Sequence, residues 1–412
     1  MLVNVKYANK AYTLKAIIMK AVILAAGEGK RLRPFTETLP KVMLPVGNKP
    51  VLEYVFDAVK NSGINEIVLV VGYKKEVIME YFENYKDVKI TYVIQDKQLG
   101  TAHALLQAKN HIKDTFIVIS GDNIIDQNSI SQLIKDKSNF SILIKEHPHP
   151  SKYGVVFVEK GKLKEIVEKP KEELGKFIST GIYKLPKTIF KQIEELAAQG
   201  VYALSSVIQL VVDKGENINT IIAQSWADIV YPWDLIHLNE TMIHNAPSSV
   251  SGIIEKGVTL KGNVSVGKDT TIYSGCYIVG PVMIGEGCEI GPNACIFPST
   301  TIGNNSVVHP FSQVRNSVIM NDVRIGSNSF IKNSIIGRGS IIENNFSSID
   351  GNSTVEIEGE FKKLENIGVM IGEDSTIGSH VVVEPGKIIG RRCKIGPMKR
   401  IIENIASESK VM

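Results

Sequence analysis

The chain has 412 residues, enough for two or three domains with full cores, and its 43% hydrophobic and 22% charged residues are typical of a globular protein. The formal net charge of +4 is small for this length and the Lys and Arg residues are scattered, so nothing indicates a nucleic-acid partner. No apolar run approaches the ~18 residues that cross a bilayer, and we expect no membrane partner either.

The first 18 residues precede a strand predicted to begin at Met19. They lack the long apolar core and the small-residue cleavage site of a signal peptide. We interpret residues 1–18 as an N-terminal extension or a misplaced start, with Met19 as the alternative first residue.

The stretch from Met19 to Lys41 combines a predicted strand, a glycine-rich turn and a group of cations. A run of small and branched apolar residues, 21–25, is followed by Gly27-Glu28-Gly29. The cations that come next are Lys30, Arg31, Arg33 and Lys41. Glycines let backbone N–H groups approach phosphate oxygens, while Arg offers a planar fork and Lys a point charge to the same anion. Neither a P-loop nor a complete dinucleotide fingerprint is present, so we predict another kind of polyphosphate site.

From Lys20 to about Ala223, short apolar runs alternate with amphipathic stretches. The predicted strands are 66–71, 90–94 and 116–120, and the predicted helices are 51–60, 75–82 and 101–108. This alternation indicates βαβ units on a mixed, mostly parallel sheet, in a Rossmann-like α/β domain over residues 19–245. Ligands of such sheets bind beyond the C-terminal ends of the strands.

The string from Leu24 to Lys41, LAAGEGKRLRPFTETLPK, resembles the signature of the sugar-1-phosphate nucleotidylyltransferases, LAAGxGxRLxPxT followed by PK. That family joins a nucleoside triphosphate to a sugar 1-phosphate and releases pyrophosphate. The resemblance implies that Ala26, Gly27 and Gly29 bind the nucleotide. It also implies that Arg31 and Lys41 are catalytic and stabilise charge on the transferring and leaving phosphates.

The segment Gln95 to Ala102, QDKQLGTA, matches the string with which this family reads the base. The resemblance implies that Gln95, Gly100 and Thr101 contact a pyrimidine, so that the nucleotide is UTP or dTTP. Hydrogen bonds to a base edge also reject wrong bases strongly. The alternative is that Thr101 merely caps a helix.

Two aspartates match the metal ligands of the family. Asp122 follows the predicted strand 116–120, and Asp228 lies in Trp226-Ala227-Asp228-Ile229. Nucleotidyl transfer between two phosphorylated substrates needs a divalent cation, and Mg²⁺ prefers one or two carboxylates together with phosphate oxygens. The resemblance implies Mg²⁺ bound by Asp122 and Asp228, although an ordinary surface carboxylate is the alternative for Asp228.

Three further segments resemble sugar-binding elements of the family: Tyr153-Gly154, Glu168-Lys169-Pro170 and Ser179-Thr180-Gly181. They imply that Gly154, Glu168 and Gly181 contact the sugar and that Lys169 contacts its phosphate. Ser179 stands where many relatives have Asn, so glucose and N-acetylglucosamine both remain open.

The reaction that the resemblance implies is direct attack of the sugar phosphate on the α-phosphorus, with no covalent intermediate. A GDP-mannose-type enzyme is the main alternative within the class, and a regulatory homologue without activity is the alternative outside it. The intact Arg31, Lys41, Asp122 and Asp228 argue against the regulatory homologue.

Near Gly252 the pattern changes to a six-residue repeat. Aliphatic residues keep one phase at Leu260, Val266, Ile272, Ile278, Ile284, Ile290, Ile296, Ile302, Val308 and Val314, and a second run comprises Ile371, Ile377, Val383, Ile389 and Ile395. Six residues make one short strand and a turn, so three repeats close a triangular coil. The pattern resembles the left-handed parallel β-helix of hexapeptide proteins, which we predict over residues 250–400.

Two parts of this region depart from the repeat. The phase shifts between the two runs, and residues 350–368 have no six-residue period, which predicts a loop or excursion. Residues 401–412 are polar with scattered isoleucines, and we predict a C-terminal tail that is a short helix or a frayed end.

Many hexapeptide proteins are acetyl-CoA-dependent acyltransferases with a His base, including the bifunctional enzymes that make UDP-N-acetylglucosamine. The comparable segment here has Ser327 and Phe330 where those enzymes have His and Tyr. We therefore expect no acetyl transfer.

Hexapeptide β-helices usually associate in threes, and an apolar outer face is expected here from Cys276, Cys288 and Cys295 at outward phases of the repeat, with Phe297 and Phe311. This pattern predicts a homotrimer or a dimer of trimers. The four cysteines lie in this C-terminal third without a CxxC pair, at Cys276, Cys288, Cys295 and Cys393. Their spacing argues against a zinc site and a disulfide framework, and we expect a reducing, cytoplasmic location.

Overall fold

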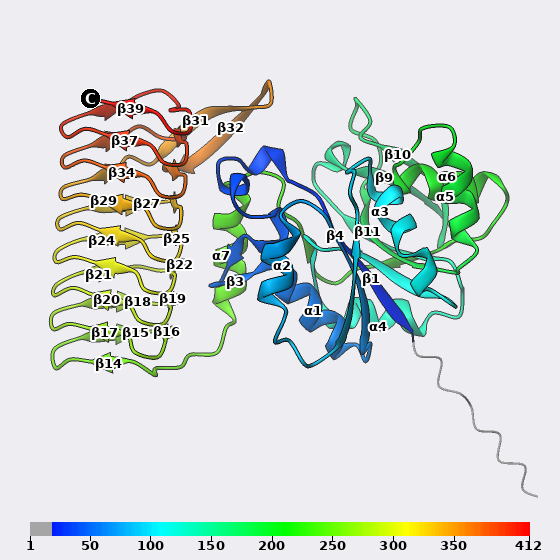
Figure 1. The fold of residues 1–412 in the computed structure, drawn as a ribbon, viewed down its shortest axis with the longest axis horizontal. Helices are drawn as coiled ribbons and strands as arrows, with labels where there is room; N and C mark the ends of the chain where they lie inside the picture. The colour runs from blue at the N-terminus through cyan, green and yellow to red at the C-terminus, as the bar shows by residue number, and fades with distance from the viewer. Residues whose placement is uncertain (1–18) are drawn as a thin grey trace, which may run out of the picture.

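The computed structural model describes residues 19–412, and the predicted N-terminal extension, residues 1–18, lies outside this range. Figure 1 shows an α/β domain on one side and a stack of short parallel strands on the other. In the described part of the chain, no helix is long and apolar enough to cross a membrane.

One nine-stranded sheet organises the α/β domain, in the order β5-β4-β1-β6-β11-β8-β12-β10-β9. Its strands are β1 (Lys20–Ala25), β4 (Glu66–Val71), β5 (Lys89–Ile94), β6 (Phe116–Ser120), β8 (Ser141–Glu146), β9 (Gly154–Glu159), β10 (Lys162–Glu168), β11 (Phe177–Leu185) and β12 (Asn219–Ile222). Strands β5, β4, β1 and β6 are parallel, whereas β11 runs antiparallel to β6 and β8. The sheet is therefore mixed, as predicted. Because β1, β4 and β6 are buried on both faces, they appear in the sequence as unbroken apolar runs.

Helices cover both faces of this sheet. They are α1 (Val51–Asn61), α2 (Lys75–Tyr81), α3 (Thr101–Gln107), α4 (Gln127–Lys135), α5 (Ile189–Ala197) and α6 (Leu204–Asp213), whereas α7 (Asp234–His244) packs against the second domain. One apolar core lies under α1, α2 and α4, and a second lies under α3, α5 and α6. The strands and helices predicted between residues 51 and 120 are confirmed, and their ends differ from the prediction by one residue at most.

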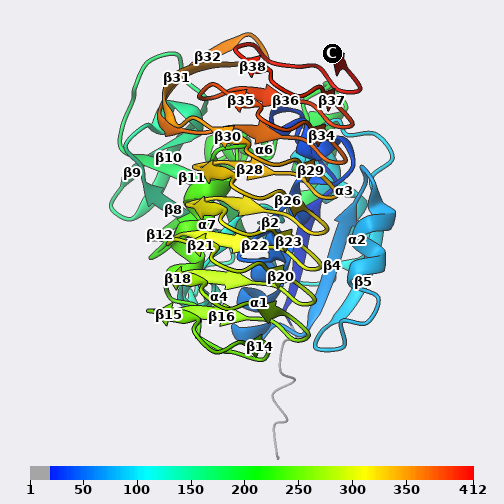
Figure 2. The same cartoon turned by 90° about the vertical axis from the view of Figure 1, so that its left-hand side faces the viewer.

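The second domain is a parallel β-helix whose three sides are three sheets, seen coil above coil in Figure 2. The first side consists of β14 (Ile253–Ile254), β17 (Thr271–Ile272), β20 (Glu289–Ile290), β23 (Val307–Val308), β26 (Arg324–Ile325), β29 (Ile341–Ile342), β34 (Thr376–Ile377), β37 (Lys394–Ile395) and β39 (Lys410–Val411). The second side consists of β15 (Thr259–Lys261), β18 (Tyr277–Val279), β21 (Cys295–Ile296), β24 (Gln313–Arg315), β27 (Phe330–Lys332), β30 (Ser347–Ser348), β35 (Val382–Val383) and β38 (Arg400–Ile401). The third side, which we call the docking sheet, consists of β16 (Val264–Val266), β19 (Val282–Ile284), β22 (Thr300–Ile302), β25 (Val318–Ile319), β28 (Ile335–Ile336), β33 (Met370–Ile371) and β36 (Ile388–Ile389).

The aliphatic residues of the repeat form one buried core inside these coils, which confirms the predicted hexapeptide β-helix. The predicted phase shifts do not interrupt the stack. Five positions, instead of six, separate Val314 from Ile319 and Ile331 from Ile336. Both shortened steps lie at the corner that leads into the docking sheet, so the coil loses one corner residue and keeps its sides paired.

The excursion predicted at residues 350–368 is an antiparallel hairpin of β31 (Gly351–Ile357) and β32 (Glu360–Ile367). The hairpin leaves the stack after β30, and the chain rejoins the stack at β33, which pairs with β28. The prediction of a helical or frayed tail is wrong, because β38 and β39 pair with earlier coils. Ile401 lies six residues after Ile395 and continues the inward phase of the core.

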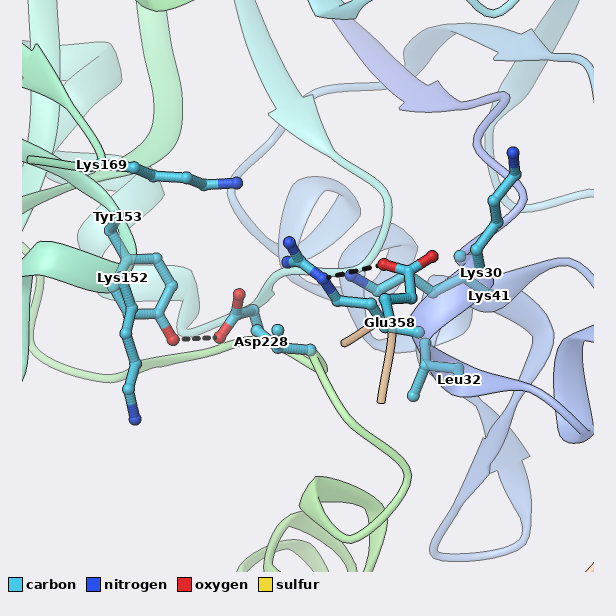
Figure 3. Close-up of a pocket in the computed structure, with 11 residues that line it drawn as sticks. Lys30, Leu32, Lys41, Lys152, Tyr153, Lys169, Asp228 and Glu358 are labelled. Atoms are coloured by element: carbon cyan, nitrogen blue, oxygen red, sulfur yellow. Dashed lines mark hydrogen bonds and ion pairs between the residues drawn. The ribbon is translucent and has the colours of Figure 1, made fainter. Parts of the chain in front are cut away.

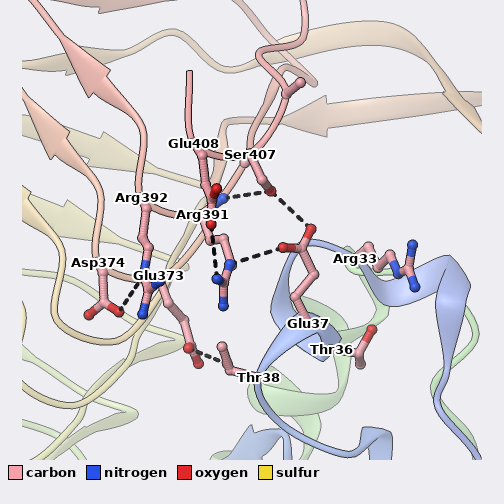
Figure 4. Close-up of polar contacts among 12 residues, drawn as sticks. Arg33, Thr36, Glu37, Thr38, Glu373, Asp374, Arg391, Arg392, Ser407 and Glu408 are labelled. Atoms are coloured by element: carbon pink, nitrogen blue, oxygen red, sulfur yellow. Dashed lines mark hydrogen bonds and ion pairs between the residues drawn. The ribbon is translucent and has the colours of Figure 1, made fainter. Parts of the chain in front are cut away.

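The two domains share an apolar interface. Leu32, Phe35 and residues of α7 form one buried cluster with residues of the docking sheet, including Ile335. Figure 4 shows the polar part of this interface, where the Thr38 hydroxyl contacts the Glu373 carboxylate. There Arg391 Nε also lies 3.2 Å from Glu37 Oε2. The β-helix therefore packs against the segment that directly follows Arg31.

Candidate active site

The predicted signature lies at the C-terminal end of β1, where the chain leaves the sheet. Residues 30–32 and 41–43 form short 3-10 helices on either side of a cavity of about 410 Å³. Lys30, Arg31 and Lys41 line this cavity together with Asp228. Figure 3 shows that residues of both domains surround it. The predicted cations therefore gather at the sheet edge at which ligands of α/β proteins bind.

Glycine is required at one position of the loop. Gly29 has φ 75°, and a Cβ there would lie 2.8 Å from Lys41 Cβ. Gly29 therefore lets the Lys41 segment pass close to the loop. A Cβ on Gly27 would meet nothing within 4 Å, which leaves the space beside this backbone open. Ala26 is buried, and its carbonyl accepts a hydrogen bond from Tyr73 N at 3.1 Å, so its role includes packing.

Lys41 and the two predicted metal ligands form one electrostatic group. Lys41 Nζ is ion-paired with Asp122, whose carboxylate also accepts a hydrogen bond from Ser120 Oγ at 2.6 Å. Burial favours the neutral form of Asp122, but Lys41 and Ser120 hold the pKa of this carboxyl below its usual range. Burial likewise favours neutral Lys41, yet Asp122 keeps the pKa of the ammonium raised. Both groups are charged near neutral pH.

Asp228 has a different environment. Its Oδ1 accepts a hydrogen bond from the Tyr153 hydroxyl at 3.0 Å, as Figure 3 shows. Burial raises the pKa of Asp228 to about 6, since desolvation outweighs the attraction of Lys41. The short strands β7 (Ile124–Ile125) and β13 (Trp226–Ala227) pair antiparallel and bring the segments of Asp122 and Asp228 together.

The donor set of this group fits magnesium. Asp122 and Asp228 line one cavity of about 360 Å³ and offer carboxylate oxygens only. Among residues 19–412, no cluster of three or more His, Cys, Asp or Glu side chains could hold a metal. Two carboxylates that leave further positions to substrate phosphates are the arrangement that Mg²⁺ prefers, rather than a complete protein cage.

All four predicted sugar-site residues line the same cavity: Gly154, Glu168, Lys169 and Gly181. A Cβ on Gly154 would lie 3.2 Å from Glu168 Oε2, so glycine lets these two residues lie side by side. Gly181 adopts φ 74°, a left-handed conformation that favours glycine. The Ser179 hydroxyl is hydrogen-bonded to the Tyr183 hydroxyl at 2.8 Å.

The predicted base-reading residues lie less directly on this cavity. Gln95 is 3% exposed, and its Nε2 contacts His103 Nδ1 at 2.9 Å. A Cβ on Gly100 would lie 2.5 Å from Tyr202 O, so only glycine fits there. Thr101 lines the cavity, and its hydroxyl accepts a hydrogen bond from Leu204 N at 3.0 Å. Thr101 therefore caps the first N–H of α6 rather than α3.

The structure adds residues that the sequence motifs did not identify. Tyr153 and Lys152 line the cavities, and Tyr153 could have been found because it belongs to the YG element. Asn123 Nδ2 donates to Thr180 O at 2.5 Å and so joins the metal and sugar segments. Glu358, at the tip of the β31–β32 hairpin, lies 3.4 Å from Arg31 Nε, and no sequence signal marks it.

Comparisons with known families match parts of both domains. Residues 20–245 match the nucleotidyl transferase family, residues 278–362 match the GMPPB C-terminal domain, and residues 368–396 match the hexapeptide repeat of succinyl-transferase.

Among relatives, the Bifunctional protein GlmU of Methanococcus maripaludis strain C7 is 37% identical over 400 residues, which cover 94% of this chain and 96% of the relative. The UTP–glucose-1-phosphate uridylyltransferase AglF of Haloferax volcanii is 39% identical over 223 residues, 52% of this chain and 91% of the relative. The solved structure of a putative glucose-1-phosphate thymidylyltransferase from Bacillus anthracis, in complex with sucrose, has a TM-score of 0.52 and 27% identity, covering 56% of this chain and 97% of that chain.

Proposed function

The chain belongs to the nucleotidyl transferase family and is a sugar-1-phosphate nucleotidyltransferase, and we propose that its nucleotide is a pyrimidine triphosphate, UTP or dTTP. The observation that carries the site assignment is the shared cavity. Asp122 and Asp228 line it together with Gly154, Glu168 and Lys169, so the residues predicted to bind metal, sugar and phosphate face one space. Such convergence is what an in-line transfer between two phosphorylated substrates requires.

In the proposed reaction, an oxygen of the sugar phosphate attacks the α-phosphorus of the triphosphate. The bond between the α-phosphorus and its bridging oxygen breaks, and pyrophosphate leaves with that oxygen. Arg31 and Lys41 stabilise the negative charge on the transferring and leaving groups, and Lys169 holds the sugar phosphate. Asp122 and Asp228 would hold Mg²⁺, which would neutralise charge between the two anionic substrates.

The base is proposed from two considerations. The Gln95–Ala102 segment resembles the pyrimidine-reading string, and the relatives include a UTP–glucose-1-phosphate uridylyltransferase. The GMPPB C-terminal domain match makes a guanylyltransferase the competing proposal. The sugar, glucose or N-acetylglucosamine, follows from neither consideration.

One grid of assays decides between these proposals. Pure enzyme with Mg²⁺ is incubated with each of four triphosphates and three sugar 1-phosphates, of glucose, N-acetylglucosamine and mannose, and released pyrophosphate is measured. We expect UTP or dTTP to exceed GTP at least tenfold in kcat/KM, because a base-edge hydrogen bond discriminates by that factor or more. Asp228→Asn serves as the inactive control. Highest activity with GTP and mannose 1-phosphate would reject the pyrimidine proposal.

Acetyl transfer is the second candidate function, because at least six relatives carry the name Bifunctional protein GlmU. Against it, Ser327 and Phe330 replace the His and Tyr of the bifunctional enzymes. His380 Nε2 lies 3.3 Å from Asn345 Nδ2 at an exposed turn, as expected of a turn residue. We expect no thiol release from acetyl-CoA and glucosamine 1-phosphate. Thiol release that disappears in His309→Ala or His380→Ala would show that another histidine acts as the base.

We also propose a homotrimer, or a dimer of trimers, assembled through the β-helix in the cytoplasm. The two sides of the β-helix that the α/β domain leaves uncovered carry exposed Phe330 and Ile341. Apolar outer faces of this kind are buried in obligate oligomers. The prediction that Cys276 and Cys288 face outward is wrong, because both are buried in the core of the β-helix, whereas Phe311 is exposed as predicted. The cysteines of the described chain are free and three of them are buried, which suits a reducing compartment.

A further inference from the structure

The tip of the β31–β32 hairpin lies at the candidate active site of the α/β domain, where Glu358 lines the cavity. Its turn residues, Glu358 and Gly359, both have positive φ, at 51° and 78°, and Ile357 pairs with Glu360 across the turn. Two residues with positive φ form the tight turn whose twist matches paired strands. The position of Glu358 is therefore fixed by the hairpin itself.

The hairpin is held against the α/β domain along its second strand, β32. The Tyr231 hydroxyl donates to Glu360 Oε2 at 3.1 Å, and Lys362 Nζ lies 2.7 Å from the same carboxylate. Lys362 also lies over the Tyr231 ring, 5.5 Å from its centroid. At the base of the hairpin, Ile367 is buried in the interdomain cluster. These contacts anchor the strands and leave the tip carboxylate at the cavity.

Glu358 forms an ion pair with Arg31, the residue that we assign to the phosphates of the triphosphate. Its Oε2 lies 3.4 Å from Arg31 Nε, and the side chains of Glu358 and Arg31 are partly exposed, at 46% and 38%. Lys152 and Lys169 line the same cavity, and neither forms an ion pair within residues 19–412. Within this group of cations, Arg31 is the one whose guanidinium already has a carboxylate partner from the β-helix.

We propose that the Glu358 carboxylate competes with the phosphates of the triphosphate for Arg31. The triphosphate must therefore displace Glu358 from Arg31 when it binds. A carboxylate and a phosphate bind the same kind of donor, and Glu358 lies at the Nε edge of the Arg31 guanidinium, so a phosphate that binds at this edge must displace it. The triphosphate also carries several negative charges that repel Glu358. The β-helix thereby weakens triphosphate and pyrophosphate binding and helps the product to leave. This inference rests on the proposed function, because it assigns Arg31 to the phosphates.

Pyrophosphate alone is the probe that tests this inference. Its affinity for the full chain is measured by calorimetry at about 0.15 M salt, where charges more than ~8 Å apart are largely screened. An exposed ion pair is weak, so we expect Glu358→Gln to lower the Kd by about two- to fivefold and Glu358→Lys to lower it further. The matched controls are Glu356→Gln and Glu356→Lys, which change an exposed charge two residues away on the same hairpin.

Three outcomes would overturn the inference. Weaker pyrophosphate binding in Glu358→Gln, with an unchanged melting temperature, would show that Glu358 orients Arg31 for phosphate instead of competing with it. Equal effects at positions 356 and 358 would show a general charge effect. Unchanged affinity in both Glu358 variants would show that the contact is irrelevant. Failure of the proposed function is separate, because it appears as absent pyrophosphate release by the unaltered chain in the substrate grid.

Discussion

Ile335 allows the contact between the two domains to be measured. It begins the two-residue strand β28, and Ile341 begins the next strand, β29, in the same coil. The residues after them, Ile336 and Ile342, belong to the core of the β-helix. Ile335 is 0% exposed because the α/β domain covers the docking sheet, whereas Ile341 is 40% exposed on an uncovered side. The two positions are therefore a matched pair, and they differ mainly in whether the α/β domain covers the side chain.

Replacing a buried isoleucine by alanine typically costs about 2–5 kcal/mol, and we expect about 3 kcal/mol for Ile335→Ala. Ile341→Ala should cost less than about 1 kcal/mol, since much of its side chain is already in water. For an unfolding dependence of about 3 kcal/mol per molar urea, the larger loss lowers the unfolding midpoint by about 1 M.

Tryptophan fluorescence makes the assay specific to one domain. The two tryptophans of the chain, Trp226 and Trp233, both lie in the α/β domain. A midpoint lowered in the fluorescence signal by Ile335→Ala would thus report a change in the β-helix that destabilises the other domain. If Ile335→Ala and Ile341→Ala shift this midpoint equally, or if neither shifts it, the docking sheet does not stabilise the α/β domain and the reasoning is refuted.

The remaining predictions concern the metal, the assembly and the polar interface. Asp122→Asn and Asp228→Asn should each lower turnover at least about a hundredfold at limiting Mg²⁺, and near-normal activity in either would exclude its metal role. Because the raised pKa of Asp228 is about 6, a proton competes with the metal below that pH, so the Mg²⁺ concentration for half-maximal activity should rise up to about tenfold from pH 6 to pH 5. Light scattering should give a trimer or hexamer for the full chain and a monomer for residues 19–245, with the opposite result refuting assembly through the β-helix. Burial raises the pKa of Glu373 above its ordinary value of 4.5, so the folded state binds its proton more tightly and loses stability as pH rises above 4.5. Glu373→Gln should remove this loss and raise stability at pH 7 by about 1 kcal/mol, which denaturant titrations at pH 5 and pH 7 measure.

The sequence predicted the local structure and the inward core well. Strands such as 66–71 and 116–120 are apolar runs with the length of a buried strand. The inward isoleucines repeat every six residues, which is the period of a triangular β-helix coil. The end of the β-helix was also readable, because Ile401 follows Ile395 at the same six-residue spacing. The polar residues around Ile401 nevertheless predict a tail, where the structure has a further strand of the β-helix.

Contacts between distant segments could not be predicted in the same way. Ile335 and Ile341 each open an Ile-Ile pair, so their sequence contexts are almost identical, and only the docked domain makes one of them a core residue. Glu358 lies in a stretch without any repeat, and its partner Arg31 is more than three hundred residues away. The motifs brought the candidate metal and sugar residues together because these residues lie in or next to strands of the central sheet, whereas a counter-ion from the other domain has no such signature.

The number of coils in the β-helix fixes the position of the hairpin along the axis of the stack. Residues that stack in successive coils, such as Ile272 and Ile290, are 18 residues apart, and neighbouring strands are separated by about 4.8 Å. The height at which the hairpin leaves the stack is therefore set in whole steps. One coil added between β25 and β31 would raise the Glu358 tip by about 4.8 Å, more than the distance of 3.4 Å that now joins it to Arg31. The β31–β32 hairpin therefore reaches Arg31 only with the present number of coils. A β-helix with more or fewer coils before the hairpin would need a hairpin of another length.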